Sequence, residues 1–566
     1  MRHSLRFLLV GIVAVSLSQP LYPQSVLAPP AAEAPRKTVE DAALLDYIQK
    51  AWDTLSRSMS DCNSLVDPKV TTTPILYLPA GMETPSDVVA MQQHCKVDVE
   101  HLPNKITHMG DVSVSSIPRP GLLYLPNRYV VPGGRFNEMY GWDSFFIIRG
   151  LVDDGRAGLA HGMVENFFFE IENYGAILNA NRTYFFTRSQ PPLLSSMIQA
   201  VYDAENKKDA PKAKAWLQRA YGYAERDYSL WTHEPHLAGK TGLARYTDIG
   251  AGPVPEMADD SQYYPDVIRW LVAHPDVHTD YLLRAPEDPT AEQAETLARS
   301  SCDVRTSSVC AHAYADGNRL TANFYAGDRA MRESGFDPSF RFGPFSGSTE
   351  NYAPICLNSL LYKYELDMAR FARLLGKSSD QSKWLARARA RHAAVNRYLW
   401  NPAKGMYYDY DFVAGKQSTY NYITAFYPLW AGLASKQQAA QVEKHLSVFE
   451  HAGGLAMSDH DSGLQWDLPF GWAPTNWFAV EGLATAGYYA DAARVSREFM
   501  QMVRQNFERD KTVREKYNVV TGSTTVNLSA GYRSNVVGFG WTNATYLEMK
   551  QLLSARGAHA ATAAAH

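Results

Sequence analysis

Apolar side chains recur at three- and four-residue spacings over several long stretches of the chain. This spacing predicts amphipathic helices, because residues three and four apart lie on one face of a helix. Gly376, Asn401 and Pro402 stand where helices commonly end. From Ala42 onward we therefore expect a helical scaffold, with its clearest helices over Leu366–Lys377, Asp380–Pro402, Lys436–Phe449 and Tyr488–Phe507.

Alternation of apolar and polar positions, which is typical of strands, is scarce. The best examples are Thr73–Ala80 and Leu122–Val131. The pattern therefore predicts a mostly helical fold with small extended segments. Between the helices lie connections rich in Trp, Tyr, Asp and Arg, which places the chemistry on loops at one end of the scaffold. No internal repeat is visible.

The N-terminus carries a different pattern. Arg2 and Arg6 precede a short apolar run over Phe7–Leu17, and small residues follow it. This order indicates a secretory signal peptide, too short to remain as a membrane anchor, although a buried N-terminal helix is the alternative. We expect residues 1–30 to be signal peptide and leader, and the Pro/Ala-rich residues 31–41 to be a flexible leader. The protein would then be exported, periplasmic or secreted, and not held in a membrane.

Composition and charge limit the class of partner. Of 566 residues, 46% are apolar and 20% charged, which is the balance of a globular protein with a sizeable core. The length allows one large domain or three smaller ones. The formal net charge is -4, and no block of Lys and Arg is suited to tracking phosphates. Nucleic acid is therefore not an expected partner.

Five cysteines allow disulfides without requiring them. A small loop closed by Cys302 and Cys310 is one possibility and a Cys62–Cys95 bridge is a second, which leaves Cys356 free. Reduced cysteines in the core are the alternative. No CxxC pair indicates zinc or redox chemistry.

Several loop segments combine aromatic rings with carboxylates, amides and arginines. Rings cover the C–H faces of sugars, while Asp, Asn, Gln and Arg form the directed hydrogen bonds that hydroxyls need. A polyhydroxylated ligand suits this mixture. The segments are Pro132–Phe146, Asn173–Pro192, Glu333–Gly343, Leu464–Trp477, Val513–Val519 and Gly538–Asn543.

Motifs for other chemistries are missing. The sequence has no GxGxxG after a strand, no GxxxxGK[ST], no GxSxG and no HExxH, so we expect no cofactor and no metal. Carboxylates remain, and with sugars they indicate glycosidic bond cleavage, in which one carboxyl protonates the leaving oxygen and another activates water or attacks carbon. Composition does not choose among the candidates, and a structural role is the alternative for each. They are Glu138, Asp143, Glu333, Asp337, Asp467 and Glu515.

Two of these stretches resemble signature motifs of the trehalases of glycoside hydrolase family 37. They are PGGRFNEMYGWDSFF at Pro132–Phe146 and QWDLPFGWAP at Gln465–Pro474. The segments NANRTYFFTRSQPP, ESGFD, EKY and GFGWTN are also similar to the family, so the resemblance spans roughly residues 45–553. It implies an all-α fold, an (α/α)6 barrel, as a single catalytic domain over residues 42–555, followed by a disordered tail over 556–566.

The resemblance also implies an activity: inverting hydrolysis of α,α-trehalose to two glucose molecules. Asp337 is similar to the family's general acid and Glu515 to its general base. In an inverting site the two carboxyl groups stand about 6.5–9.5 Å apart, to leave room for water. Asp337 would need a raised pKa, through burial or a nearby carboxylate, to stay protonated.

A glucose-binding set follows from the same resemblance. Asp143 is expected as an ionised acceptor for sugar hydroxyls, and Arg188 and Gln190 as donors. The tryptophans would form apolar walls, with core packing as the alternative for each. The expected partner is a small sugar bound by a monomer. The resemblance assigns Arg135, Trp142, Asp143, Asn179, Arg188, Ser189, Gln190, Glu256 and Gly335, and Trp466 and Trp472 join them as candidate walls.

The chain departs from the family pattern in ways that make the site less polar. Val254 replaces an arginine, Phe470 an asparagine and Phe336 a tryptophan, and Tyr532 stands near a position where a glutamate is expected in an otherwise altered lid. We therefore keep two alternatives open: hydrolysis of another α-glucoside or glucosyl-polyol, and a sugar-binding protein with impaired catalysis. Retention of Asp337 and Glu515 counts against the second alternative.

Overall fold

Helices dominate the fold, as the sequence pattern predicted. The computed structural model describes residues 39–66, 73–256, 262–277, 279–284, 313–530 and 534–563. The expected signal peptide and most of the expected leader lie outside these residues, as do Cys302, Cys310 and Tyr532. Within the described part, no helix is long and apolar enough to cross a membrane.

The four helices expected from apolar spacing are all present. Gly376 follows the first of these four helices. Its φ of +77° is the left-handed conformation in which helices commonly end. The expected stretch over Leu366–Lys377 is the C-terminal half of a longer helix. The helices are α12 (Ile355–Leu374), α13 (Ser378–Tyr398), α15 (Lys436–Glu443) and α17 (Tyr489–Asp510).

One set of helices packs in a closed cycle. Going round it, each helix contacts the next, and the last contacts the first. The cycle runs through α4 (Gly141–Asp153), α6 (Leu194–Asn206), α12, α14 (Tyr427–Trp430), α16 (Ala473–Thr485) and α18 (Gly540–Ala563).

A second set of helices packs against the first. α5 (Ala157–Asn173) contacts α4 and α6, and α7 (Ala210–Trp231) contacts α6 and α12. α13 packs on α12, α17 on α16 and α18, and α1 (Val39–Thr54) on α17 and α18. Each helix of the cycle therefore buries side chains against its neighbours in the cycle, and most also pack against a helix of the second set.

Strands are short, as expected. The segment over Thr73–Ala80 forms β2, which pairs in parallel with β3 and β4. The expected strand over Leu122–Val131 forms two separate strands, because Pro126 interrupts it and cannot donate to a ladder. The strands are β1 (Ser56–Arg57), β2 (Ile75–Leu78), β3 (Asp98–His101), β4 (Leu122–Leu123), β5 (Tyr129–Val130), β6 (Leu282–Arg284), β7 (Tyr314–Ala315), β8 (Asn318–Leu320), β9 (Tyr352–Ala353), β10 (Trp400–Asn401), β11 (Met406–Tyr407), β12 (Tyr410–Asp411), β13 (Lys416–Gln417), β14 (Glu450–His451), β15 (Gly454–Leu455), β16 (Phe470–Trp472) and β17 (Lys516–Asn518).

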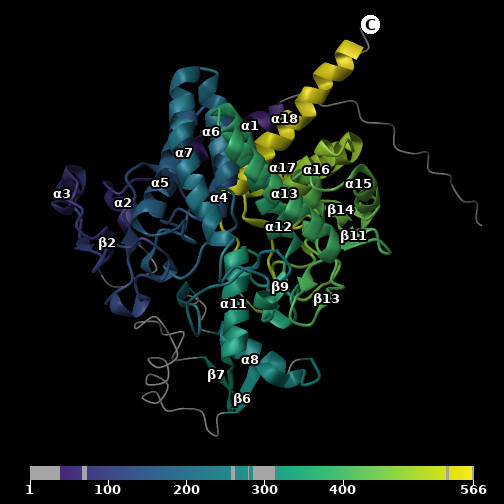
Figure 1. Ribbon diagram of the computed structural model, residues 1–566, viewed down its shortest axis with the longest axis horizontal. Helices are drawn as coiled ribbons and strands as arrows, with labels where there is room; N and C mark the ends of the chain where they lie inside the picture. Colours follow the sequence, from purple (N-terminus) through teal and green to yellow (C-terminus); the bar gives the residue numbers. More distant parts are fainter. Residues whose placement is uncertain are drawn as a thin grey trace, which may run out of the picture.

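A small lobe has an apolar core of its own. Its helices α8 (Tyr263–Ala273) and α11 (Ala322–Ser334) lie with β6 and β7 at the lower end of the view in Figure 1. Val254, Leu464 and Ala530 join this core from distant parts of the chain. The lobe therefore connects the segment before α8 to the segments that precede α16 and α18.

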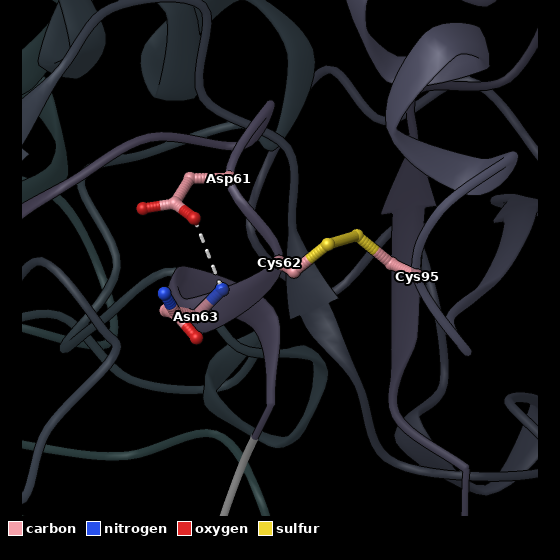
Figure 2. Close-up of a disulfide and its surroundings, with 4 residues drawn as sticks. All are labelled: Asp61, Cys62, Asn63 and Cys95. Atoms are coloured by element: carbon pink, nitrogen blue, oxygen red, sulfur yellow. Dashed lines mark hydrogen bonds between the residues drawn. A yellow bond between two sulfur atoms is a disulfide. The ribbon is translucent and has the colours of Figure 1, made fainter.

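The N-terminal region contains a disulfide between Cys62, at the start of α2 (Cys62–Leu65), and Cys95, which follows α3 (Ser86–Gln92) (Figure 2). The second of the two expected bridges is thereby confirmed. Cys356 is free and buried, as expected.

The C-terminal end differs from expectation. The domain boundary expected at residue 555 falls inside α18, which continues to Ala563 and projects beyond the other helices in Figure 1. Alanine-rich sequence has high helix propensity even where it shows no packing pattern. Residues 556–563 thus carry the end of α18, and the expected disorder over 556–566 stays a prediction.

Candidate active site

The expected site residues lie on segments that lead into helices of the closed cycle. Trp142 and Asp143 occupy the first turn of α4, and Ser189 and Gln190 precede α6. Asp337 lies between α11 and α12, while Trp466 and Trp472 precede α16 and Glu515 precedes α18. Loops that are far apart in sequence are thus brought together at the starts of neighbouring helices.

Asp337 follows a helix end with a specific backbone requirement. Gly335 ends α11 with φ +77°, a conformation that favours glycine, and a Cβ there would lie 2.9 Å from the Trp142 ring. The Asp337 side chain is 32% exposed, and its Oδ2 lies 3.5 Å from Nη1 of Arg332. Burial raises the pKa of Asp337 to about 6, against the opposing charges of Arg332 and Arg188. The carboxyl is thereby suited to hold a proton in weakly acidic solution.

Glu515 has a contrasting environment. Its side chain is 3% exposed, and its Oε2 accepts from the Lys516 ammonium at 3.2 Å. The backbone is fixed on both sides: Glu515 N donates to Val536 O at 3.0 Å, and Glu515 O accepts from Trp541 Nε1 at 3.1 Å. The contact places a positive charge directly beside this carboxyl, on the segment that leads into β17.

Asp143 lies within electrostatic reach of both of these carboxyls. Burial raises its pKa well above the usual range, and Glu515 and then Asp337 raise it further. Asp143, Asp337 and Glu515 therefore converge on one site. Burial and neighbouring negative charge favour the protonated form of Asp143, while its expected role as an acceptor for sugar hydroxyls stays a prediction.

Arg188 stands at the centre of a buried ion network. Its guanidinium donates to Glu256, lies 3.5 Å from Asp248 Oδ2 and reaches Asn179 Oδ1 at 3.4 Å. Arg188 and Glu256 both influence the pKa of Asp337, so the network adjoins the acid. The expected donor Arg188 is thus present beside Asp337, with its charge balanced by carboxylates.

Gln190 and Ser189 hold the loop before α6 in place. Gln190 Oε1 accepts from the Trp142 backbone N–H at 2.9 Å, which satisfies a free donor at the start of α4. Ser189 Oγ donates to Ile177 O at 2.6 Å, and its backbone N–H donates to Glu333 at 3.2 Å. These contacts position the loop, while the roles of both residues in sugar binding stay predictions.

The tryptophans expected as walls pack against one another. Trp466 and Trp472 are stacked with ring centroids 3.8 Å apart, and Trp142 lies 6.0 Å from Trp466 and 5.6 Å from Phe336. All of these side chains are buried. Arg135 borders the same region: it donates to Ser534 Oγ at 3.1 Å, and its charge influences the pKa of Lys516.

The other candidate carboxylates have structural partners. Glu138 pairs with Arg182 at 2.7 Å, and Glu333 accepts from the Thr247 backbone N–H at 2.7 Å. Asp467 accepts from Ser462 Oγ at 2.7 Å and from the Phe340 backbone N–H at 2.8 Å. For these three the contacts support the structural alternative. Within the described ranges, no three His, Cys, Asp or Glu side chains are grouped to hold a metal ion.

Arg332 is a site residue that sequence reasoning missed. Asp328 holds its guanidinium through Nε and Nη2, both at 3.2 Å. The hydroxyl of Tyr264 donates to Asp328 at 2.8 Å and accepts from the Val254 backbone N–H at 2.9 Å. Arg332 thus supplies a positive charge near the loop where Val254 lacks one. The available signal was its position one residue before ESGFD, at four-residue spacing from Asp328.

The apolar departures fill space around this site. Val254 is fully buried in the core of the small lobe. Phe336 packs edge-on against Trp142 and Trp466, and Phe470 lies in β16, opposite Asn518 of β17. Arg332 is linked to the Val254 backbone through Asp328 and Tyr264, whereas Phe336 and Phe470 remain apolar substitutions.

Comparison with known proteins gives a consistent result. The trehalase family model matches residues 31–554. The chain is 33% identical to the cytosolic neutral trehalase of Saccharomyces cerevisiae, covering 88% of this chain and 69% of that protein, and 34% identical to a probable trehalase of Eremothecium gossypii, covering 88% and 70%. The solved structure of neutral trehalase Nth1 from Saccharomyces cerevisiae superposes with a TM-score of 0.74 at 32% identity, covering 91% of this chain and 94% of that chain. The chain belongs to the trehalase family.

Proposed function

We propose that the protein hydrolyses α,α-trehalose to two glucose molecules with inversion, using Asp337 as general acid and Glu515 as general base. The observation that carries the proposal is the contrast between the two carboxyls. Burial raises the pKa of Asp337 to about 6, whereas Glu515 contacts the Lys516 ammonium. Two carboxyls with environments that favour opposite protonation states form an acid and base pair.

The steps follow from these two states. Asp337 donates its proton to the bridging oxygen as the glycosidic bond breaks. Glu515 takes a proton from a water molecule that attacks the anomeric carbon from the opposite face. We infer a carboxyl separation of about 6.5–9.5 Å for this geometry. We also infer that the helix cycle and its second set of helices form an (α/α)6 barrel as one domain.

The sugar to be cleaved lies, in this proposal, between the carboxyls and the buried ion network. Arg188, Glu256 and Arg332 supply charged hydrogen-bonding groups next to Asp337. Protonated Asp143 supplies a donor as well as an acceptor. Trp142 and Trp466 supply apolar surface for the C–H faces of the ring.

A second substrate class is favoured by one observation. Phe470 is buried where the family pattern has asparagine. A less polar pocket for the leaving group would suit another α-glucoside or a glucosyl-polyol. The acid and base roles are unchanged in this alternative.

We propose that the protein is exported and acts as a monomer. The basic and apolar N-terminal pattern and the Cys62–Cys95 disulfide support export, because disulfides persist in oxidising compartments. The Saccharomyces cerevisiae relative named above is described as cytosolic. Cell fractionation measures the compartment, and light scattering measures the oligomeric state.

The function is tested by glucose release from trehalose and from a panel of other α-glucosides. Asp337→Ala and Glu515→Ala are each expected to lower kcat by about a hundredfold or more, because each removes one proton-transfer group. Asp461→Asn is the matched control, since Asp461 is an exposed carboxylate on the loop before Trp466. Release from another panel member alone favours the second substrate class. Ligand-induced melting shifts without turnover would contradict catalysis and indicate a sugar-binding protein.

A further inference from the structure

A buried lysine lies directly beside the proposed base. The Lys516 side chain is 0% exposed, and its Nζ donates to Glu515 Oε2 at 3.2 Å. The same ammonium donates to Gln465 Oε1 at 2.8 Å and to Ser534 O at 3.2 Å. It also stands 5.2 Å from the centroid of the Trp472 ring. An ammonium is rarely buried without a partner of opposite charge, and here that partner is Glu515.

Gln465 extends the contact toward the proposed acid. Its Oε1 accepts from Lys516, and its Nε2 donates to the backbone carbonyl of Asp337. Its own backbone carbonyl accepts from Trp472 Nε1 at 2.7 Å, so the residue is held at both ends. A continuous line of contacts thus runs from Asp337 through Gln465 and Lys516 to Glu515.

A strand pair fixes the register of this line. β16 and β17 are antiparallel, with Trp472 opposite Lys516 and Phe470 opposite Asn518. Glu515 immediately precedes β17, and Gln465 lies on the loop that leads into β16. The backbone pairing therefore places the lysine and the glutamine on facing segments. Neither residue needs substrate in order to hold its position.

We propose that Lys516 and Gln465 are positioning residues that set the ionisation and the separation of the two reacting carboxyls. Lys516 keeps Glu515 as a carboxylate and fixes its direction. Gln465 hydrogen-bonds both to that lysine and to the backbone of Asp337. The acid and the base are thereby positioned by the same two side chains. The inference rests on the proposed function, and it adds residues that act through Asp337 and Glu515 and not on the sugar.

The other charges around Lys516 and Glu515 come from several elements. Asp337 and Arg135 influence the pKa of Lys516, and Asp143, from α4, is influenced by Glu515. Burial lowers the pKa of Lys516, and Glu515 and Asp337 oppose that shift. A positive charge in direct contact favours the carboxylate form of its neighbour.

The test is the pH profile of kcat/KM on trehalose for Lys516→Gln and Lys516→Arg. Lys516→Gln is expected to move the acid limb of the pH profile to higher pH by about one unit or more. The reason is that, without the adjacent positive charge, the base keeps its proton to higher pH. Lys516→Arg keeps the charge, so its acid limb stays at the wild-type position. Lys363→Gln is the matched control, since Lys363 pairs with Asp367 on α12 and takes no part in this line.

Gln465→Met gives an independent readout. We expect kcat to fall about tenfold, as for loss of one buried hydrogen bond. The acid limb of the pH profile is expected to stay in place, because the charge of Lys516 remains. Melting temperatures report whether each variant folds. A folded Lys516→Gln enzyme with the wild-type acid limb would overturn the proposal. So would a Gln465→Met enzyme with wild-type kcat, and this arm remains available if Lys516→Gln does not fold.

Failure of this inference is distinguishable from failure of the proposed function. If Glu515→Ala retains wild-type turnover, the base assignment itself is wrong. If Glu515→Ala is inactive while Lys516→Gln keeps its acid limb, only the role of Lys516 is wrong.

Discussion

At the scale of single residues, the site depends on how charge is distributed around Asp337. Burial raises the pKa of this carboxyl, while Arg332 and Arg188 restrain the rise. The acid therefore holds its proton in weakly acidic solution without becoming too weak to donate it. Arg332 contributes to this balance from α11, where Asp328 fixes its guanidinium.

Arg332→Ala is expected to lower kcat/KM on trehalose about ten- to a hundredfold, the equivalent of about 1.5–3 kcal/mol for a charged hydrogen bond. Because Arg332 lowers the pKa of Asp337, its removal raises that pKa further. The acid then stays protonated to higher pH, and the alkaline limb of the pH profile moves upward. Arg332→Lys, which keeps the charge, is the control. An unchanged alkaline limb in a folded Arg332→Ala enzyme would show that the guanidinium does not act on Asp337.

Val254→Arg follows from the same arrangement. Val254 is buried in the apolar core of the small lobe, and Arg332 already supplies a charge nearby. Restoring the arginine of the family pattern is therefore expected to give no gain in kcat/KM and to lower the melting temperature, because a second buried cation lacks a partner. A rise in kcat/KM would mean that the charge at position 254 is still missing.

At the scale of elements, the end of α11 determines where Asp337 lies. Gly335 turns the chain in the left-handed conformation against the face of Trp142, which belongs to the first turn of α4. The helix end, the tryptophan and the acid are therefore one packed unit. The position of Asp337 in this unit depends on Gly335, because any residue with a Cβ would disturb the packing.

Gly335→Ala is expected to cost stability on two counts. The left-handed conformation costs a residue with a Cβ about 1–2 kcal/mol, and the contact with Trp142 adds about 1–3 kcal/mol of overpacking. Gly376→Ala is the matched control, because Gly376 has the same φ of +77° with no atom within 4 Å of its Cβ position. A larger melting-temperature loss and a lower kcat for Gly335→Ala confirm the packing role. Equal effects in the two variants would contradict it.

Elements and site differ in how far the sequence predicted them. Apolar spacing located α12, α13, α15 and α17, because a helix face needs only local periodicity. Apolar spacing does not predict which helix packs against which face. The closed helix cycle was therefore found only in the structure. Arg332 and the Gln465–Lys516 contact were missed for the same reason. Their roles depend on pairs that lie far apart in the sequence, such as Tyr264 with Asp328 and Gln465 with Lys516.

At the scale of the whole molecule, the Cys62–Cys95 disulfide joins α2 to the segment after α3, and 33 residues separate the two cysteines. Replacement of both cysteines by serine is expected to destabilise this region by about 2–4 kcal/mol, mainly through the freedom gained by the unfolded chain. Melting curves of the variant and of the wild type, each with and without reductant, measure the effect. Reductant is expected to shift the wild type only. A wild-type melting temperature that does not respond to reductant would contradict a stabilising disulfide.

If Asp337 and Glu515 act from opposite faces of one sugar ring, the stereochemistry of the product must reveal it. Proton NMR of the first glucose released from α,α-trehalose distinguishes the anomers before they equilibrate. Inversion converts the cleaved glucosyl unit to β-glucose while the leaving unit stays α, so the account predicts equal initial amounts of α- and β-glucose. Initial release of α-glucose alone would indicate retention and would contradict the account.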